Sequence, residues 1–138
     1  MKLKEEYKRI IVEDFEFAAK MMKENLANDA KLFYFSGTWG ALSRIFNLSF
    51  DPELVFIHSV LNGAYNNVLA RVTASKGGET SVILPPDYFD KLAACVEDLA
   101  QRIKENKNAY DVLERISLLA FISTGNGYYL LKRGAFKI

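Results

Sequence analysis

This chain contains few of the residues that metal-binding and nucleophilic sites most often use. Among its 138 residues there is one histidine, His58, and one cysteine, Cys95. Cys/His zinc sites and the paired Glu-x-x-His motifs of di-iron bundles need several such ligands from one chain. Glu13, Asp14 and Glu16 are the best candidates for an all-oxygen magnesium site, but nothing elsewhere in the sequence points to them. A solvated helix face explains these carboxylates more simply, so we expect no metal and no cofactor.

Nucleophile and phosphate-binding signatures are also missing. Cys95 stands between apolar positions, and we expect a small buried side chain rather than a nucleophile. The sequence holds neither a Gly-x-x-x-x-Gly-Lys-Ser/Thr run nor a Gly-x-Gly-x-x-Gly run. These exclusions favour a binding or interaction role over an enzymatic one.

A stripe of polar residues is the most informative feature of the middle of the chain. Ser59, Asn62 and Asn66 recur at spacings of three and four, so on a helix they share a face, with His58 on its flank. If that face is buried, each carboxamide needs partners, because an unsatisfied buried donor or acceptor costs about 1–3 kcal/mol. We favour another helix or a second copy of the chain as the partner. Solvent exposure and a ligand site are the alternatives.

Small residues form two adjacent rows in the preceding apolar segment. Ser36 and Gly40 are four apart, as are Gly37 and Ala41. Trp39 would flank the groove that these two rows form. Each helical glycine costs about 0.8–1 kcal/mol relative to alanine, so two of them three residues apart indicate close packing or a local break. We favour a tight helix contact over a ligand cradle. The predicted interface residues are Ser36, Gly37, Trp39, Gly40, Ala41 and Ser59.

A loosely recurring pattern keeps the cradle as an alternative. The same order of residue types occurs three times: a small polar residue, a glycine, an aromatic residue and a closing Leu-x-Arg. It is found in residues 36–44, 62–71 and 126–133. Their internal spacings differ, so helical phase is not preserved and chance similarity is the simpler explanation. If the pattern is real, its arginines converge on a small anion such as a phosphate. The ligand-binding candidates are Arg44, His58, Asn62, Asn66 and Arg71.

The end of the sequence is basic and aromatic. Lys132, Arg133 and Lys137 are interleaved with Tyr128, Tyr129 and Phe136. Such interleaving is typical of weak surfaces for single-stranded nucleic acid. Three charges are too few for strong binding, so we favour an ordinary basic tail and do not expect nucleic acid as the main partner.

Apolar residues at spacings of three and four predict a chain of helices. Residues 4–24 and 30–46 form the first two, and the second carries so few charges that we expect it to be buried on most sides. Asp51-Pro52-Glu53 starts a third helix, which the turn residues 75–78 end, and residues 81–84 read as a β-friendly connector. Pro85-Pro86-Asp87 starts a fourth, and the break at 106–108 precedes a fifth, which residues 124–127 terminate. The last eleven residues are left as either a helical turn or an extended tail.

Length and composition are those of one ordinary globular domain. Hydrophobic residues make up 50% of the chain and charged residues 25%, with a formal net charge of +1, which gives no global field to hold nucleic acid or a membrane. No apolar run is long enough to span a bilayer, and the first residues lack the pattern of a signal peptide. We therefore expect a single all-α domain over residues 1–138, a bundle of about five helices with short turns, located in the cytoplasm.

The expected function follows from this apolar, aromatic-rich composition. Aromatic residues make up 13% of the chain, and the second helix is poor in charge, so the bundle has more apolar surface than five helices readily hide. We expect a non-enzymatic, self-associating interaction module, a homodimer packed through the second and third helices. The alternatives are a helical protein that binds a small phosphate-like or nucleotide-like anion, and weak nucleic-acid binding through the tail.

Overall fold

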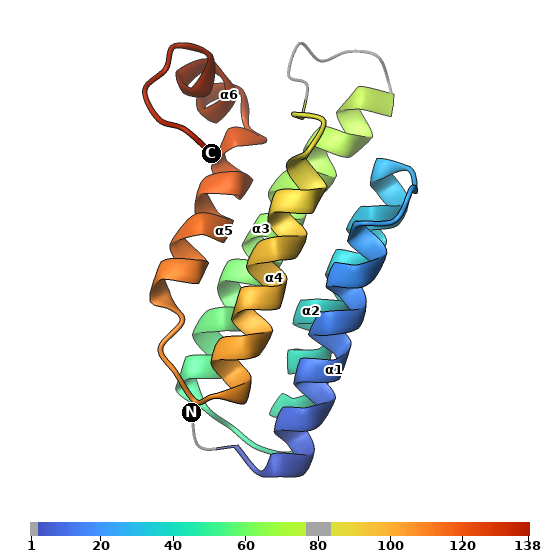
Figure 1. Cartoon of the computed structure of the whole chain (residues 1–138), viewed down its shortest axis with the longest axis vertical. Helices are drawn as coiled ribbons and strands as arrows, with labels where there is room; N and C mark the ends of the chain where they lie inside the picture. Colours follow the sequence, from blue (N-terminus) through green and yellow to red (C-terminus); the bar gives the residue numbers. More distant parts are fainter. Residues whose placement is uncertain (1–2, 77–83) are drawn as a thin grey trace.

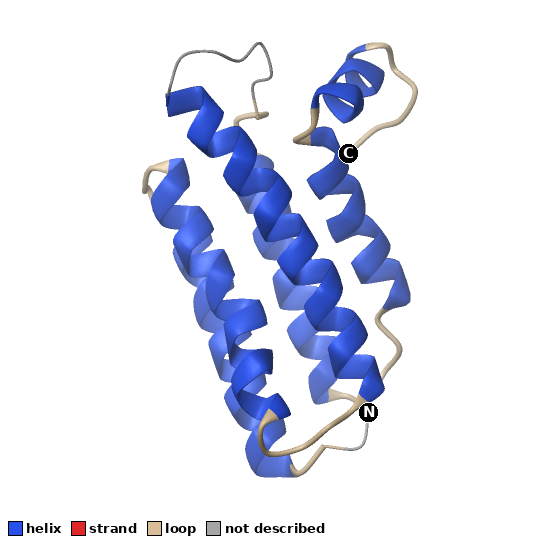
Figure 2. Ribbon diagram, turned by 180° about the vertical axis from the view of Figure 1, so that it is seen from behind, coloured by secondary structure: helices blue, strands red, loops and turns tan. Residues whose placement is uncertain are grey.

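The computed structural model describes residues 3–76 and 84–138, and this part of the chain is helical with no strand. Figures 1 and 2 show long helices running up and down the molecule, with one short helix across one end. The all-α class predicted from the sequence is confirmed. The helices are α1 (Glu5–Met22), α2 (Asn28–Phe46), α3 (Pro52–Lys76), α4 (Tyr88–Lys104), α5 (Tyr110–Ile122) and α6 (Gly125–Lys132).

Five of the helices close into a ring around one core. Helix α1 packs against α2 and α4, α3 packs against α2 and α5, and α4 and α5 complete the circuit. Short turns make α1 and α2 antiparallel neighbours, and α4 and α5 likewise (Figure 1). Helix α6 packs mainly against α5. The outer faces of α2 and α3 therefore lie next to each other on the surface of the bundle.

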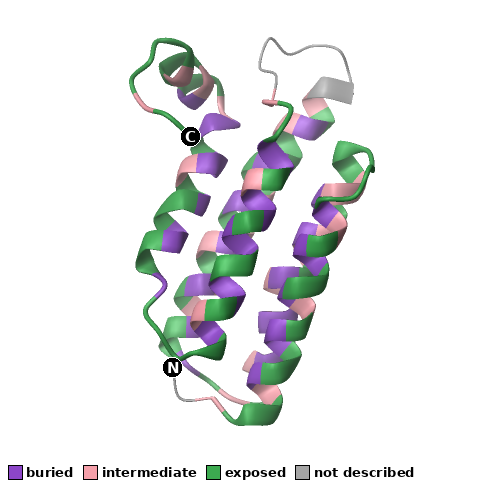
Figure 3. Cartoon of the chain, viewed as in Figure 1, coloured by how far each residue is buried: buried purple, intermediate pink, exposed green. Residues whose placement is uncertain are grey.

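The apolar stripes read from the sequence face this core. In Figure 3 the buried residues follow the inward side of each long helix. Helix α3 begins where expected, and Oδ1 of Asp51 accepts a hydrogen bond from the backbone N–H of Glu53 at 2.9 Å. Buried stripe residues of α3 are Leu54, Ile57, Leu61, Ala64, Val68 and Val72. Those of α4 are Phe89, Leu92, Val96, Leu99 and Ile103.

Two expectations need correction. Helix α2 is buried on one face only, because it sits on the wall of the ring: Phe33 is 70% exposed, and Gly37 is exposed too. Residues 124–127 begin a sixth helix, since the Thr124 hydroxyl accepts from the Gly127 N–H at 3.1 Å and caps α6. The prediction of about five helices was therefore one short.

The expected turn after α3 and the β-friendly connector fall largely on residues 77–83, which lie outside the described residues. Within residues 3–76 and 84–138, none of the helices combines the length and the apolar character that crossing a bilayer requires.

Candidate functional site

The outer surface of α2 and α3 carries almost no charge. No Asp, Glu, Lys or Arg occurs between Leu32 and Ser43 of α2 or between Leu54 and Ala70 of α3. Large apolar side chains stand out from it at both ends, since Phe33 is 70% and Phe56 is 49% exposed. We call the outward-facing residues of these two stretches the α2–α3 face. An uncharged surface with exposed aromatic residues is characteristic of a contact region.

Packing among the described residues does not explain the glycines on the α2–α3 face. A Cβ placed on Gly37 or Gly63 would meet nothing within 4 Å, and one on Gly40 would meet only the Arg44 Nη1, at 3.8 Å. None of the three has a positive φ. Together they cost the isolated helices about 2–3 kcal/mol relative to alanine, with no gain in packing between the described helices. The space above them is open to another backbone.

An aromatic seam joins α2 to α3 beneath this surface. The ring of His58 lies between Trp39, at a centroid distance of 6.0 Å, and Phe46, at 5.3 Å, and Trp39 also meets Tyr65 at 5.6 Å. Such edge-to-face contacts stabilise the helix pair beyond simple burial. Trp39 Nε1 is buried without an acceptor among the described residues.

The seam contains the one close pairing of a hydroxyl with the histidine. Ser43 Oγ lies 2.9 Å from His58 Nε2 and donates to the Trp39 carbonyl at 3.1 Å. Because the hydroxyl has one proton, this arrangement makes His58 Nε2 the donor and Ser43 the acceptor. No acidic residue is recorded at the other ring nitrogen in the described part of the chain. The pair links two helices and lacks the third group that orients a catalytic dyad.

The predicted polar stripe lies on the α2–α3 face rather than against another helix of the same chain. Ser59 and Asn66 are exposed and Asn62 is half-buried. Asn66 Nδ2 donates to Asn62 Oδ1 at 2.7 Å, and the Ser59 hydroxyl donates to the Val55 carbonyl at 3.0 Å. These hydrogen bonds stay within α3, because this side of the helix faces outward; of the two favoured partners, a second copy of the chain remains a prediction. Most of each carboxamide's bonding capacity is left for solvent or a partner.

The predicted interface residues of α2 spread around the helix. Ala41 is fully buried and belongs to the core, whereas Gly37 is exposed and Ser36, Trp39 and Gly40 are half-buried. Ala41 therefore cannot line a contact with another molecule. The other four remain on or just below the α2–α3 face.

The structure does not bring the predicted arginines together. Arg44 pairs with Asp14 of α1 at 2.8 Å, and Arg71 Nε donates to the Ser123 carbonyl at 2.8 Å. His58 of α3 pairs with Ser43, the residue that precedes Arg44 in α2. Arg71 lies thirteen residues beyond His58 along α3, a distance of about 20 Å at 1.5 Å per residue. Arg133 is the C-cap residue of α6, where its Nη1 donates to Tyr129 Oη at 2.6 Å. The recurring Leu-x-Arg pattern therefore does not build one anion cradle.

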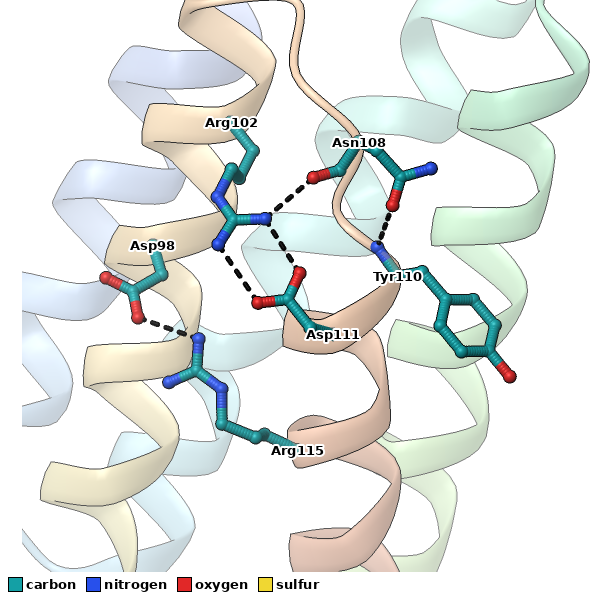
Figure 4. Close-up of polar contacts among 6 residues, drawn as sticks. All are labelled: Asp98, Arg102, Asn108, Tyr110, Asp111 and Arg115. Atoms are coloured by element: carbon teal, nitrogen blue, oxygen red, sulfur yellow. Dashed lines mark hydrogen bonds and ion pairs between the residues drawn. The ribbon is translucent and has the colours of Figure 1, made fainter.

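The most developed polar network was not anticipated, and it joins α4 to α5 (Figure 4). Arg102 binds both carboxylate oxygens of Asp111, at 2.7 and 3.0 Å, and donates to the Asn108 carbonyl, while Arg115 pairs with Asp98 at 2.9 Å. The hydrogen bond from Arg102 holds the pKa of Asp111 below its usual value. Asn108 Oδ1 accepts from the backbone N–H of residue 110, which caps the start of α5. With these groups paired to one another, the network acts as a structural clasp.

The carboxylates of the described residues and Cys95 were the other candidates for chemistry. Among the described residues no group of His, Cys, Asp and Glu side chains is arranged to hold a metal ion. Cys95 is 4% exposed, as expected for a small core residue, and burial raises the pKa of its thiol.

Comparison with known proteins adds no relationship: no protein-family model, curated protein or solved structure matches this chain.

Proposed function

We propose that this chain is a non-enzymatic interaction module that forms a homodimer through the α2–α3 face. The observation that carries the proposal is a set of three helical glycines: Gly37 and Gly63 lie under open space, and Gly40 is covered only by the Arg44 side chain. A glycine weakens a helix unless close approach makes up the loss. A second backbone laid over these positions supplies that approach.

The chemistry of the face favours a second copy as the partner. In a two-fold dimer each patch meets its own image, so the surface must be self-complementary. Like charges would then oppose one another, but the two stretches that make up the face contain no charged residue, and the Arg44 guanidinium that reaches over Gly40 is paired with Asp14. Carboxamides suit such a contact, because the side chains of Asn62 and Asn66 each carry both donors and acceptors. An asparagine can thus pair with the same asparagine of another copy.

The size of the face sets the expected affinity. The uncharged stretches are about 18 and 25 Å long, and two packed helices are about 20 Å across, so the face covers on the order of 400 Å² in projection. Standard interfaces bury about 800 Å² per partner. Side-chain relief, including the protruding Phe33 and Phe56, increases the accessible area beyond the projection. We therefore expect a dissociable dimer of roughly micromolar affinity rather than an obligate one.

The direct test places a charge on the face. In Ser59→Lys, two ammonium groups are brought to the dimer contact, whereas Ser117→Lys places the same exposed change on α5, outside the α2–α3 face. Analytical ultracentrifugation should show the wild type and Ser117→Lys dimerising alike and Ser59→Lys monomeric. Equal dimerisation of all three proteins would contradict the proposed surface.

The lone free thiol of Cys95 fits a reducing compartment, so the proposal places the dimer in the cytoplasm.

The anion-binding alternative receives no support from the separated arginines. In the tail, the Lys132 ammonium lies over the Tyr128 ring and the Arg133 guanidinium over the Tyr129 ring. These cations already cover the aromatic rings that nucleic-acid bases would stack on.

A further inference from the structure

Three aromatic rings gather on the outside of α1 and α2, at one edge of the α2–α3 face. The Tyr34 ring lies 5.9 Å from the ring of Phe17 and 5.6 Å from the ring of Phe33, in both cases edge to face. Phe17 is 54% and Phe33 is 70% exposed. The rings hold one another in place while much of their surface meets solvent, as in the aromatic anchors of protein interfaces. We call these three residues the aromatic cluster.

The α2–α3 face alone is smaller than a standard interface. Its projected area is on the order of 400 Å², against about 800 Å² per partner in a stable complex. A contact that also includes α1 is wider by one helix, about 10 Å, and its projected area is on the order of 600 Å². The area that a dimer needs therefore favours a second copy that covers the aromatic cluster as well as the α2–α3 face.

The spacing of Phe33 and Gly37 suits an antiparallel pairing of α2 with its own copy. In a two-fold dimer, when one residue faces a second residue of the partner, that second residue also faces the first. The exposed Phe33 ring of each copy then fills the open space over the partner's Gly37, and the axis passes level with Phe35, midway between them. In a parallel pairing Phe33 would face Phe33, and both glycine spaces would stay empty.

The polar stripe of α3 is centred on the same axis. Helices α2 and α3 run in opposite directions, and Ser43 Oγ lies 2.9 Å from His58 Nε2 (Figure 1). Eight residues before Ser43 is Phe35, and eight residues after His58 is Asn66, so these two residues lie at the same level. Asn66 of each copy therefore faces its counterpart, and a carboxamide can both donate to and accept from an identical group.

An exposed leucine fills the second open glycine in this arrangement. Leu69 and Gly63 lie three residues to either side of Asn66, so each faces the other across the axis. Leu69 is 38% exposed, and a Cβ on Gly63 would meet nothing within 4 Å. The two glycines under open space are thus each matched with an exposed apolar side chain.

From these matches we propose that two copies pack with α2 and α3 each antiparallel to its own counterpart, and that the aromatic cluster forms one edge of the contact. Phe17 contacts Tyr34, the residue next to Phe35, so Phe17 lies close to the axis and meets its counterpart on α1. This inference rests on the proposed function, because it assigns the geometry of that dimer.

The distance between two spin labels tests the orientation. The label is attached to Asn47→Cys in a Cys95→Ala background that ultracentrifugation shows to dimerise, and the distance is measured by pulsed electron paramagnetic resonance. Asn47 is the exposed C-cap of α2, twelve residues from Phe35. At 1.5 Å per residue the antiparallel pairing places the two labels about 36 Å apart. A parallel pairing leaves them at the same level, about 10–25 Å apart, and a distance in that range would overturn the proposal.

A substitution on α1 tests the aromatic cluster separately from the α2–α3 face. Phe17→Ser should raise the dissociation constant of the dimer about tenfold, because it removes an aromatic ring from the contact. Tyr110→Ser is the matched control, since Tyr110 is 57% exposed and lies on α5. A dimer that Ser59→Lys dissociates but Phe17→Ser leaves at unchanged affinity would keep the proposed function and overturn this inference. A wild-type protein that stays monomeric would overturn both.

Discussion

Replacing Gly63 by alanine should change two properties of the protein in opposite directions. In the monomer the new methyl group meets nothing within 4 Å, so the substitution removes the helix penalty of glycine without strain. The expected gain in the free energy of unfolding is about 0.8–1 kcal/mol. Unfolding entropies of about 2.1 cal/mol/K per residue convert this gain into a rise in Tm of about 3 °C for a chain of this length. In the dimer the same methyl group enters the space that the partner backbone needs, and overpacking of about 1–3 kcal/mol should weaken association roughly tenfold.

Two measurements separate these effects. Thermal unfolding is followed by circular dichroism at a concentration far below the dissociation constant, and the monomer–dimer equilibrium is measured by ultracentrifugation. Gly37→Ala should behave in the same way, since its Cβ also meets open space. A fall in monomer Tm would refute the description of Gly63 as unpacked. A rise in Tm with unchanged dimerisation would refute its place at the interface.

Three further outcomes are expected. Gly127→Ala should destabilise the fold by about 1–3 kcal/mol and expose α6 to proteolysis, because its Cβ would meet the carbonyl of the α5 end; Gly125→Ala, with open space around its Cβ, should not. Arg102→Gln should lower stability at neutral pH. The folded-state pKa of Asp111 is depressed below 3.8, so the pair stabilises the fold above that value and this stabilisation is lost as the pH falls through the folded-state pKa. The urea midpoints of the wild type and Arg102→Gln should therefore converge in acid. Cys95 should react with a thiol reagent in the native protein far more slowly than in urea, and equal rates would show that it is not buried.

Helix positions in the core were predictable because they depend on local periodicity. The buried stripe of α4 appears in the sequence as apolar residues three and four apart, and Asp51-Pro52 marks the start of α3 through its capping chemistry. A helical turn near the end of the sequence was left open, but the start of α6 at Gly125 was missed for a physical reason. Gly125 and Gly127 resemble a helix stop in the sequence. Position 127 requires glycine because its backbone contacts the end of α5, and no local sequence pattern reveals that contact.

The candidate site was predictable only in part. The stripe of Ser59, Asn62 and Asn66 does share one helix face, because that grouping needs nothing but helical spacing. Whether this face points inward depends on which helices flank α3, and the flanking by α2 and α5 is a property of the whole bundle. The partner of Arg44 is likewise set by packing, since Asp14 lies thirty residues earlier in the chain.

Native mass spectrometry of the purified protein over a dilution series tests self-association most directly. The proposed α2–α3 contact predicts a dimer mass at high concentration that gives way to monomer through the micromolar range, with Ser59→Lys monomeric throughout. A wild-type protein that stays monomeric at every concentration would contradict the proposal, and the open space above Gly37 and Gly63 would then need another explanation.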